Sequence, residues 1–360
     1  MPGAEVFECV PVALRAHTAG YEKRHCMIKT LLRLFGPPAD VAVPATALPR
    51  VPLQMHWLAG TQMPIPDWEL MGAFDSEEQD DDRRHAYWNS AALTWLETCV
   101  ETLGSDYGVR ESDDFLLLSA MEDRPAQVFL NTCQRMLTRI NRSLGPLADN
   151  SGWGKYVVMV FAQPDDYYHY VSHYYPEGGE YAMSSGMFIQ AGYGHFVMPE
   201  EGLDAMEPVI AHELTHCLLT HLPIPAWLNE GIAVNTEHHL FPHLADPRAQ
   251  LYFPHEVAAQ HAAYWDEESI QAFWSGKSFL RTDDGSRLSY DLATKIAALA
   301  ARNDAAFRTF VANAHMQDAG VGAEHHLGFP IAHLAEAVLG EGPWQPRPES
   351  WREGVEGGQF

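Results

Sequence analysis

The segment AHELTHCLLTHLPIPAWLNEGIA, residues 211–233, joins a helical pattern of apolar residues to three side chains that could bind one metal ion. Residues four apart in an α-helix lie one above the other, so His212 and His216 would present their imidazoles to the same ion. Glu213 would lie on the adjacent flank, where its carboxylate can take a proton from metal-bound water. The pattern H-E-x-x-H therefore predicts two metal ligands and a general base within little more than one helical turn.

A catalytic metal site of this kind needs a third protein ligand. Glu230 follows His216 by fourteen residues and comes after a turn marked by Pro225, so it could lie on an antiparallel helix that returns its carboxylate to the ion. His221 is an alternative, but on a continuing helix its side chain would point about 140° away from that of His216. The spacing favours Glu230.

The stretch HELTHCLLTHLPIPAWLNEGIAV, residues 212–234, resembles the active-site signature of gluzincin-type zinc metallopeptidases. The likeness is closest to bacterial members, the peptidase MA-like family, whose second motif reads W-L-N-E-G-hydrophobic-A. It implies one zinc ion bound by His212, His216 and Glu230, with Glu213 as the general base. The resemblance is specific over residues 200–240 and weaker over 155–200 and 286–340. Another group of zinc peptidases, the metzincins, would require Gly at 219 and His at 222, and both positions are Leu.

The support of the first histidine departs from the family pattern. Many gluzincins have an aspartate four residues after the ligand glutamate, and that position is Val234 here. A metal-bound imidazole usually donates its other N–H to an acceptor, so Asn235 or Glu237 could take this role. The sequence leaves the choice open.

Peptide hydrolysis also requires a hydrogen-bond donor for the developing oxyanion. The resemblance points to Tyr290, in the stretch LSYDLA, with Tyr193 and His195 as alternatives on the loop before the motif. Residues 183–190, MSSGMFIQ, resemble the edge strand that binds an extended substrate above the zinc in such enzymes. They could equally form an ordinary strand of a hairpin.

Apolar periodicity predicts an α+β fold. Helices are expected near Tyr87–Leu103, Pro125–Leu144, Leu203–Cys217, Trp227–His238, Arg287–Arg302, Asp304–His315 and Pro330–Leu339, and extended segments at 115–119, 155–161, 187–190 and 195–198. The resemblance makes this a zincin-like metallopeptidase fold with three parts. These are an irregular, proline-rich N-terminal appendage (1–85), a mixed α/β upper lobe (86–202) and a mainly helical lower lobe (203–360).

Composition excludes several classes of partner. With 23 Lys and Arg against 48 Asp and Glu, the 360-residue chain has a formal net charge of −25, which disfavours nucleic acid and anionic lipid. No apolar run is long enough to span a membrane. The five cysteines are odd in number and contain no C-x-x-C pair, so reduced thiols and a cytoplasmic location are expected.

The expected function is zinc-dependent hydrolysis of peptide bonds, with a peptide or protein as substrate. Two alternatives remain: a metal-stabilised binding or scaffold protein with little peptidase activity, and a zinc hydrolase of a non-peptide amide or ester. Glu213 favours an enzyme, because a structural metal site needs ligands but no base. The sequence leaves open the substrate, endo- or exopeptidase action and the oligomeric state.

Overall fold

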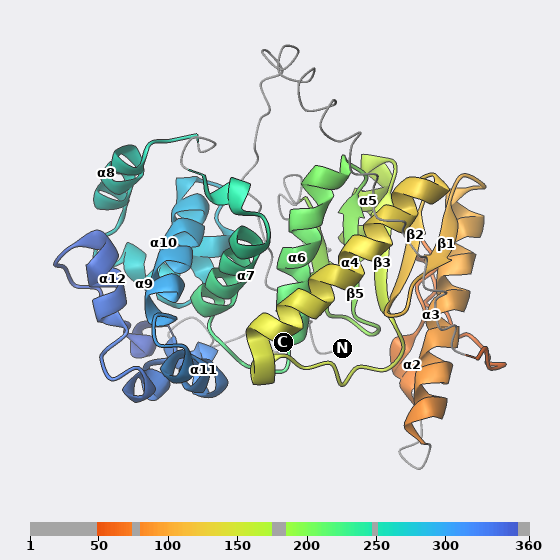
Figure 1. The fold of residues 1–360 in the computed structure, drawn as a ribbon, viewed down its shortest axis with the longest axis horizontal. Helices are drawn as coiled ribbons and strands as arrows, with labels where there is room; N and C mark the ends of the chain where they lie inside the picture. Colours follow the sequence, from red (N-terminus) through yellow and green to blue (C-terminus); the bar gives the residue numbers. More distant parts are fainter. Residues whose placement is uncertain (1–48, 74–79, 175–184, 247–250, 352–360) are drawn as a thin grey trace, which may run out of the picture.

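The computed structural model describes residues 49–73, 80–174, 185–246 and 251–351. They form an α+β structure with one small mixed sheet (Figure 1). The sheet and the helices that cover it occupy one half of the molecule, helices α7 to α12 occupy the other half, and α6 lies between them. The expected fold class is confirmed at this level.

The sheet has five strands in the order β1-β2-β3-β5-β4. Its central pairs, β2 with β3 and β3 with β5, are parallel, whereas the outer pairs, β1 with β2 and β4 with β5, are antiparallel. The strands are β1 (Gly108–Glu111), β2 (Phe115–Ser119), β3 (Tyr156–Phe161), β4 (Met187–Ile189) and β5 (His195–Pro199). The hairpin expected from 187–190 and 195–198 is therefore present, and β4 lies at the edge.

Helices cover both faces of the sheet. Leu117, Val158 and Phe196 belong to a core cluster with α4 (Asp123–Leu144) and α6 (Leu203–Leu219). On the opposite face, Leu118 and Val157 pack with α3 (Asp81–Leu103) and α5 (Pro164–Tyr174). Since both faces are covered, the central strands are almost continuously apolar, which is why FLLLS and YVVMVF are readily predicted as strands.

The core on the α6 side continues from the sheet into the C-terminal helices. The remaining elements are α7 (Ala226–Leu240), α8 (Pro254–Tyr264), α9 (Ser269–Trp274), α10 (Asp284–Ala300), α11 (Asp304–Asn313), α12 (Ala332–Leu339) and the short 3-10 turns Gly145–Leu147, Pro242–Ala245, Lys277–Leu280, Met316–Asp318, Val321–His326 and Pro348–Trp351. No helix within the described ranges has the length and apolar character that crossing a membrane requires.

Two helices differ in detail from the sequence-based expectation. Helix α3 begins at Asp81, ahead of Tyr87, because the Asp80 side chain accepts a hydrogen bond from the Arg83 N–H and caps the helix. Pro208 cannot donate the usual backbone hydrogen bond, which predicts a place in the first turn of the motif helix or at a kink. It lies in the second turn of α6, inside the helix.

The proline-rich N-terminal segment is described only from residue 49. The sequence also predicts a helix near residues 21–35, which lie outside the described residues. From residue 49 onward it includes the short helix α2 (Trp68–Gly72). Met63, Ile65 and Met71 are buried in the same core cluster as α3 and α5. This part of the chain is packed into the sheet half.

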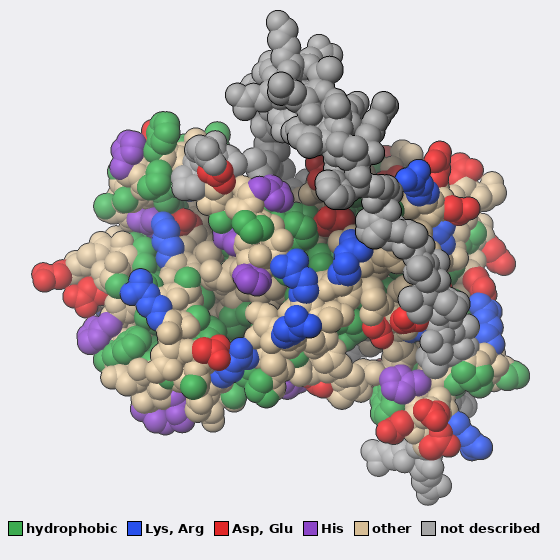
Figure 2. All heavy atoms as spheres, in the orientation of Figure 1, with side chains coloured by type: hydrophobic (Ala, Val, Ile, Leu, Met, Phe, Trp, Pro, Cys, Tyr) green, Lys and Arg blue, Asp and Glu red, His purple; other side chains and the backbone are tan. Residues whose placement is uncertain are grey.

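Charge is unevenly distributed over the surface. Figure 2 shows basic side chains gathered on the face along which α4 runs, and acidic side chains toward the margins. Arg135, Arg139 and Arg142 are exposed residues of α4.

Candidate metal centre

Helices α6 and α7 are packed against each other and carry the two motifs. Every side chain from Ile210 to His216 is buried, so the motif turn of α6 lies inside the molecule. Helix α7 begins at Ala226, directly after Pro225, whose extended conformation ends the connecting turn. The start of α7 is further held by the indole N–H of Trp227, which donates to the carbonyl of Ala319 at 3.0 Å.

Three side chains meet between these helices. The Nε2 atoms of His212 and His216 lie 3.4 and 3.5 Å from the same oxygen, Oε2 of Glu230. One potential ligand atom from each residue lies within 4.8 Å of the others. Within the described ranges, this is the only set of three or more His, Cys, Asp or Glu residues so placed. The three expected ligands are thus brought together from α6 and α7.

The three clustered side chains are buried, and their pKa values depend on one another. Glu230 is 1% exposed and each histidine 7%. Burial opposes ionisation of Glu230, but His216 and His212 outweigh it and lower the pKa of its carboxyl to about 2. Burial likewise acts to lower the pKa of His212, yet its contacts with Glu230 and Glu237 raise it to about 10. The Glu230 carboxyl therefore stays ionised, balanced by positive charge on the neighbouring imidazoles.

Glu213 lies beside the cluster on α6 and is also buried. Its Oε2 accepts a hydrogen bond of 2.9 Å from the backbone N–H of Phe188 on the edge strand β4. Burial raises the pKa of the Glu213 carboxyl, while the nearby His212 and His216 act in the opposite direction. A carboxyl with a raised pKa is better suited to exchange protons near neutral pH. No side-chain pattern in the sequence could have identified the Phe188 contact, because it is made by the backbone.

The acceptor for the first histidine is Glu237. Its Oε2 lies 3.2 Å from Nδ1 of His212. Since a carboxylate only accepts, Nδ1 carries a proton, and Nε2 is the nitrogen that faces Glu230 and the cluster. Asn235 instead donates to the carbonyls of Gly231 and Thr294, toward α10. Val234 packs against the apolar core.

Tyr290, the expected oxyanion donor, lies on α10, the helix packed most extensively against α7. It is buried, and its ring packs edge-on against Phe279 at 5.2 Å. Ala293, one turn further along α10, lies against Gly231, the neighbour of Glu230. The structure thus places Tyr290 on a helix next to α7, and its catalytic role stays a prediction.

The two alternatives to Tyr290 lie on the other face of the sheet. His195 is fully buried there, between the Tyr193 carbonyl at 2.7 Å from Nδ1 and the Tyr170 hydroxyl at 2.7 Å from Nε2. The hydroxyl of Tyr193 donates to the carbonyl of Lys155, and its ring packs against Trp68. Both residues belong to the core around α3 and α5, away from α6. Neither is placed to serve the metal centre.

Two other features expected from the sequence can also be placed. His221 is exposed and is not one of the three clustered residues. Of the segment 183–190, the structure describes residues from 185, and Met187–Ile189 form the edge strand beside α6. The strand position agrees with the expected one, and substrate binding to it stays a prediction.

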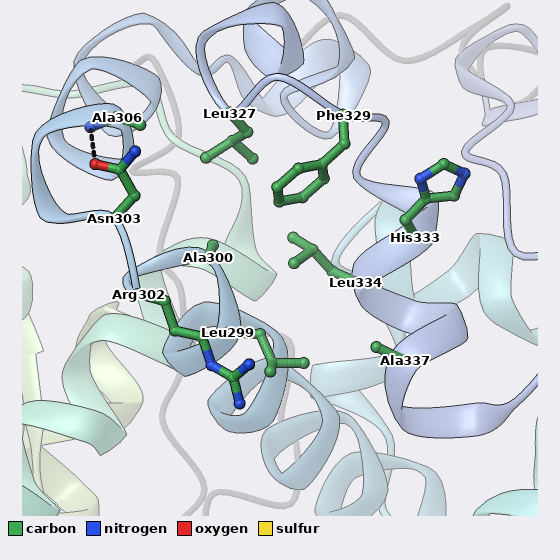
Figure 3. Close-up of a pocket in the computed structure, with 10 residues that line it drawn as sticks. All are labelled: Leu299, Ala300, Arg302, Asn303, Ala306, Leu327, Phe329, His333, Leu334 and Ala337. Atoms are coloured by element: carbon green, nitrogen blue, oxygen red, sulfur yellow. Dashed lines mark hydrogen bonds between the residues drawn. The ribbon is translucent and has the colours of Figure 1, made fainter.

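A hollow of about 340 Å³ lies elsewhere, among α10, α11 and α12 (Figure 3). Leu327, Phe329 and Leu334 give it an apolar lining, and Arg302 and His333 lie toward its margins. None of the clustered residues lines it. It is therefore separate from the candidate metal centre.

The donor set of two imidazoles and one carboxylate is one that zinc uses in catalytic sites, where a fourth position stays open for water or substrate. The residues present thus fit a single zinc ion. In comparisons with known proteins, no protein family, curated protein or solved structure matches the chain.

Proposed function

We propose that the protein is a zinc-dependent hydrolase of zincin-like fold that cleaves peptide bonds in the manner of gluzincins. The proposal is supported by the buried cluster of His212, His216 and Glu230 with a carboxylate, Glu213, on the same helix. A site that only stabilised the fold would need the ligands but no such base. The likeness of residues 212–234 to the gluzincin signature supports peptides as the substrate class.

Each residue has a separable role in this proposal. A bound zinc ion supplies Lewis acidity, which polarises the scissile carbonyl and makes a water molecule more acidic. Glu213 receives the proton of the attacking water and passes it to the leaving amine. Glu237 holds His212 in the tautomer that leaves Nε2 available. Tyr290 donates a hydrogen bond to the developing oxyanion.

The observation that carries the proposal is the hydrogen bond between Glu213 and Phe188, because it fixes a buried carboxylate beside the clustered ligands. The test is the variant Glu213→Gln. Its amide oxygen can still accept from the Phe188 N–H, whereas it cannot receive a proton from water. We expect bound zinc to be retained and turnover of a mixed peptide library to fall by at least ~100-fold.

Glu207→Gln is the matched control, since Glu207 lies on the same helix outside the cluster. It should leave both zinc and turnover unchanged. Glu230→Ala should strongly weaken zinc retention. A wild-type protein that binds zinc but cleaves no peptide would contradict the peptidase proposal. Turnover of amide or ester compounds would then indicate a non-peptide hydrolase, and its absence a scaffold protein.

A further inference from the structure

Helix α5, on the side of the sheet away from α6, carries a second pair of histidines with ligand spacing. His169 and His173 are four residues apart, so their side chains lie on one face of the helix. Both line a hollow of about 170 Å³ between α5 and the segment 60–65. The two imidazoles therefore border the same small space.

Both imidazoles are accessible for coordination. His169 and His173 are exposed, and within the described ranges neither ring nitrogen takes part in a hydrogen bond. Partial burial lowers the pKa of His173, which keeps its ring neutral at neutral pH. A neutral imidazole has one nitrogen lone pair to offer a metal ion.

The rest of the hollow determines the kind of ion. Thr61 and Gln62, which carry uncharged oxygen atoms, line the hollow opposite the two histidines, and no acidic side chain belongs to the described lining. Calcium and magnesium prefer sets of oxygen ligands that include carboxylates. Two imidazoles with neutral oxygens or waters suit zinc, nickel or copper(II) instead.

We propose that His169 and His173 form an auxiliary binding site for a divalent transition metal ion. The site is independent of the His212, His216 and Glu230 cluster and of the proposed function. Two ligands from one helix leave the remaining positions to water or to the oxygens of Thr61 and Gln62. An ion bound there would connect α5 to the segment 60–65 and stabilise their packing.

The test counts zinc equivalents by isothermal titration of the full-length chain. We expect the wild type to bind two equivalents and the double variant His169→Gln/His173→Gln to bind one. Each single variant should weaken the second equivalent, because a pair of ligands on one helix acts together. His255→Gln, which changes an exposed histidine of α8, should keep both equivalents.

A second readout is thermal stability in the Glu230→Ala background, in which the main cluster lacks its carboxylate. Copper(II) should raise the melting temperature more than zinc, as the general affinity order predicts. The double histidine variant should show a smaller increase than its Glu230→Ala parent, because His212 and His216 can still hold an ion there. A second equivalent that persists in the double variant would overturn the proposal, as would a wild type without one. If only the His212, His216 and Glu230 cluster failed to bind zinc, the equivalent lost by the double histidine variant would still be present in the wild type. The two results therefore remain distinguishable.

Discussion

His212 contacts carboxylates on both of its ring nitrogens, Glu230 at Nε2 and Glu237 at Nδ1. Positions 230 and 237 are seven residues apart on α7, two turns of helix, and therefore share a face. Asn235 lies on a different face and points toward α10. The sequence left Asn235 and Glu237 open, although the seven-residue spacing from Glu230 is the signal that distinguishes them.

Replacing Glu237 by Gln should lower zinc affinity about 10- to 100-fold, since the amide no longer offers His212 a charged acceptor. Affinity can be measured by competition with a chelator of known strength. Glu336→Gln, at an exposed position on α12, is the control and should behave as the wild type. Equal affinities for both variants would show that Glu237 does not support the ligand.

His195 makes stability depend on pH. The Tyr193 carbonyl can only accept, so Nδ1 of His195 carries the proton and Nε2 accepts from the Tyr170 hydroxyl. Complete burial lowers the pKa of His195 from 6.5 to about 4. Below pH 6.5 the unfolded chain therefore takes up a proton that the folded chain takes up only near pH 4.

The free energy of unfolding should accordingly fall by about 3 kcal/mol from this residue as the pH drops from 6.5 to 4. Above 6.5 the residue should contribute no pH dependence. Measured by urea unfolding, the free energy of unfolding should change less with pH across this range in His195→Gln than in the wild type. His255→Gln, which changes an exposed residue, should retain the wild-type pH dependence. The same pH dependence in all three proteins would refute the contribution of His195.

At the scale of elements, the crossing of α7 and α10 depends on one glycine. A Cβ atom at Gly231 would lie 2.6 Å from the carbonyl oxygen of Ala293 and 2.7 Å from Cβ of Ala297. Both are rigid parts of α10, so any side chain at 231 would push the helices apart. The glycine of the W-L-N-E-G motif thus permits the close contact next to Glu230.

Gly231→Ala should destabilise the protein by about 1–3 kcal/mol, the usual cost of overpacking, despite the better helix propensity of alanine. Gly72→Ala is the matched control, because a Cβ there would meet nothing within 4 Å. Chemical denaturation should separate the two variants. Similar stability for both would mean that α7 and α10 can move apart at little cost.

The elements that could be predicted from sequence are those with strong apolar patterns. Helices α4, α6, α7 and α10 and the buried strands β2 and β3 appear within a few residues of their expected positions. Strand β1 was not expected, since all its residues are only partly buried and show no alternation. Helix α8 was also missed, because it buries only His261 and has no apolar stripe. Packing partners, which the sequence does not specify, determine such elements.

For the whole molecule, the candidate centre connects α6, which covers the sheet, to α7, which begins the helical half. The helical motif determined which residues of α6 would face an ion, whereas the position of Glu230 depended on the packing of α7. That packing involves residues far apart in the sequence. Trp227, for example, donates a hydrogen bond to Ala319, which lies 92 residues away. Local sequence patterns cannot supply contacts of this range.

Removal of zinc should therefore destabilise the entire fold, because an ion that binds only the folded chain adds to its stability. At a zinc concentration ~1,000 times the dissociation constant the contribution is about 4 kcal/mol. Chelation should lower the melting temperature of the wild type and restoration of zinc should raise it again. The Glu230→Ala variant should respond far less, and an equal response in both would exclude the cluster as the stabilising site.

The hydrogen bond from the Phe188 N–H to Glu213 also bears on the addition of a further strand at the sheet edge. Strand β4 lies at one edge of the sheet and is only three residues long. Exposed edges with unsatisfied N–H groups are templates on which another chain can add a strand and begin to aggregate. Here a buried carboxylate already occupies the N–H of Phe188. Glu213 therefore removes one of the N–H groups that this edge could offer to an added strand.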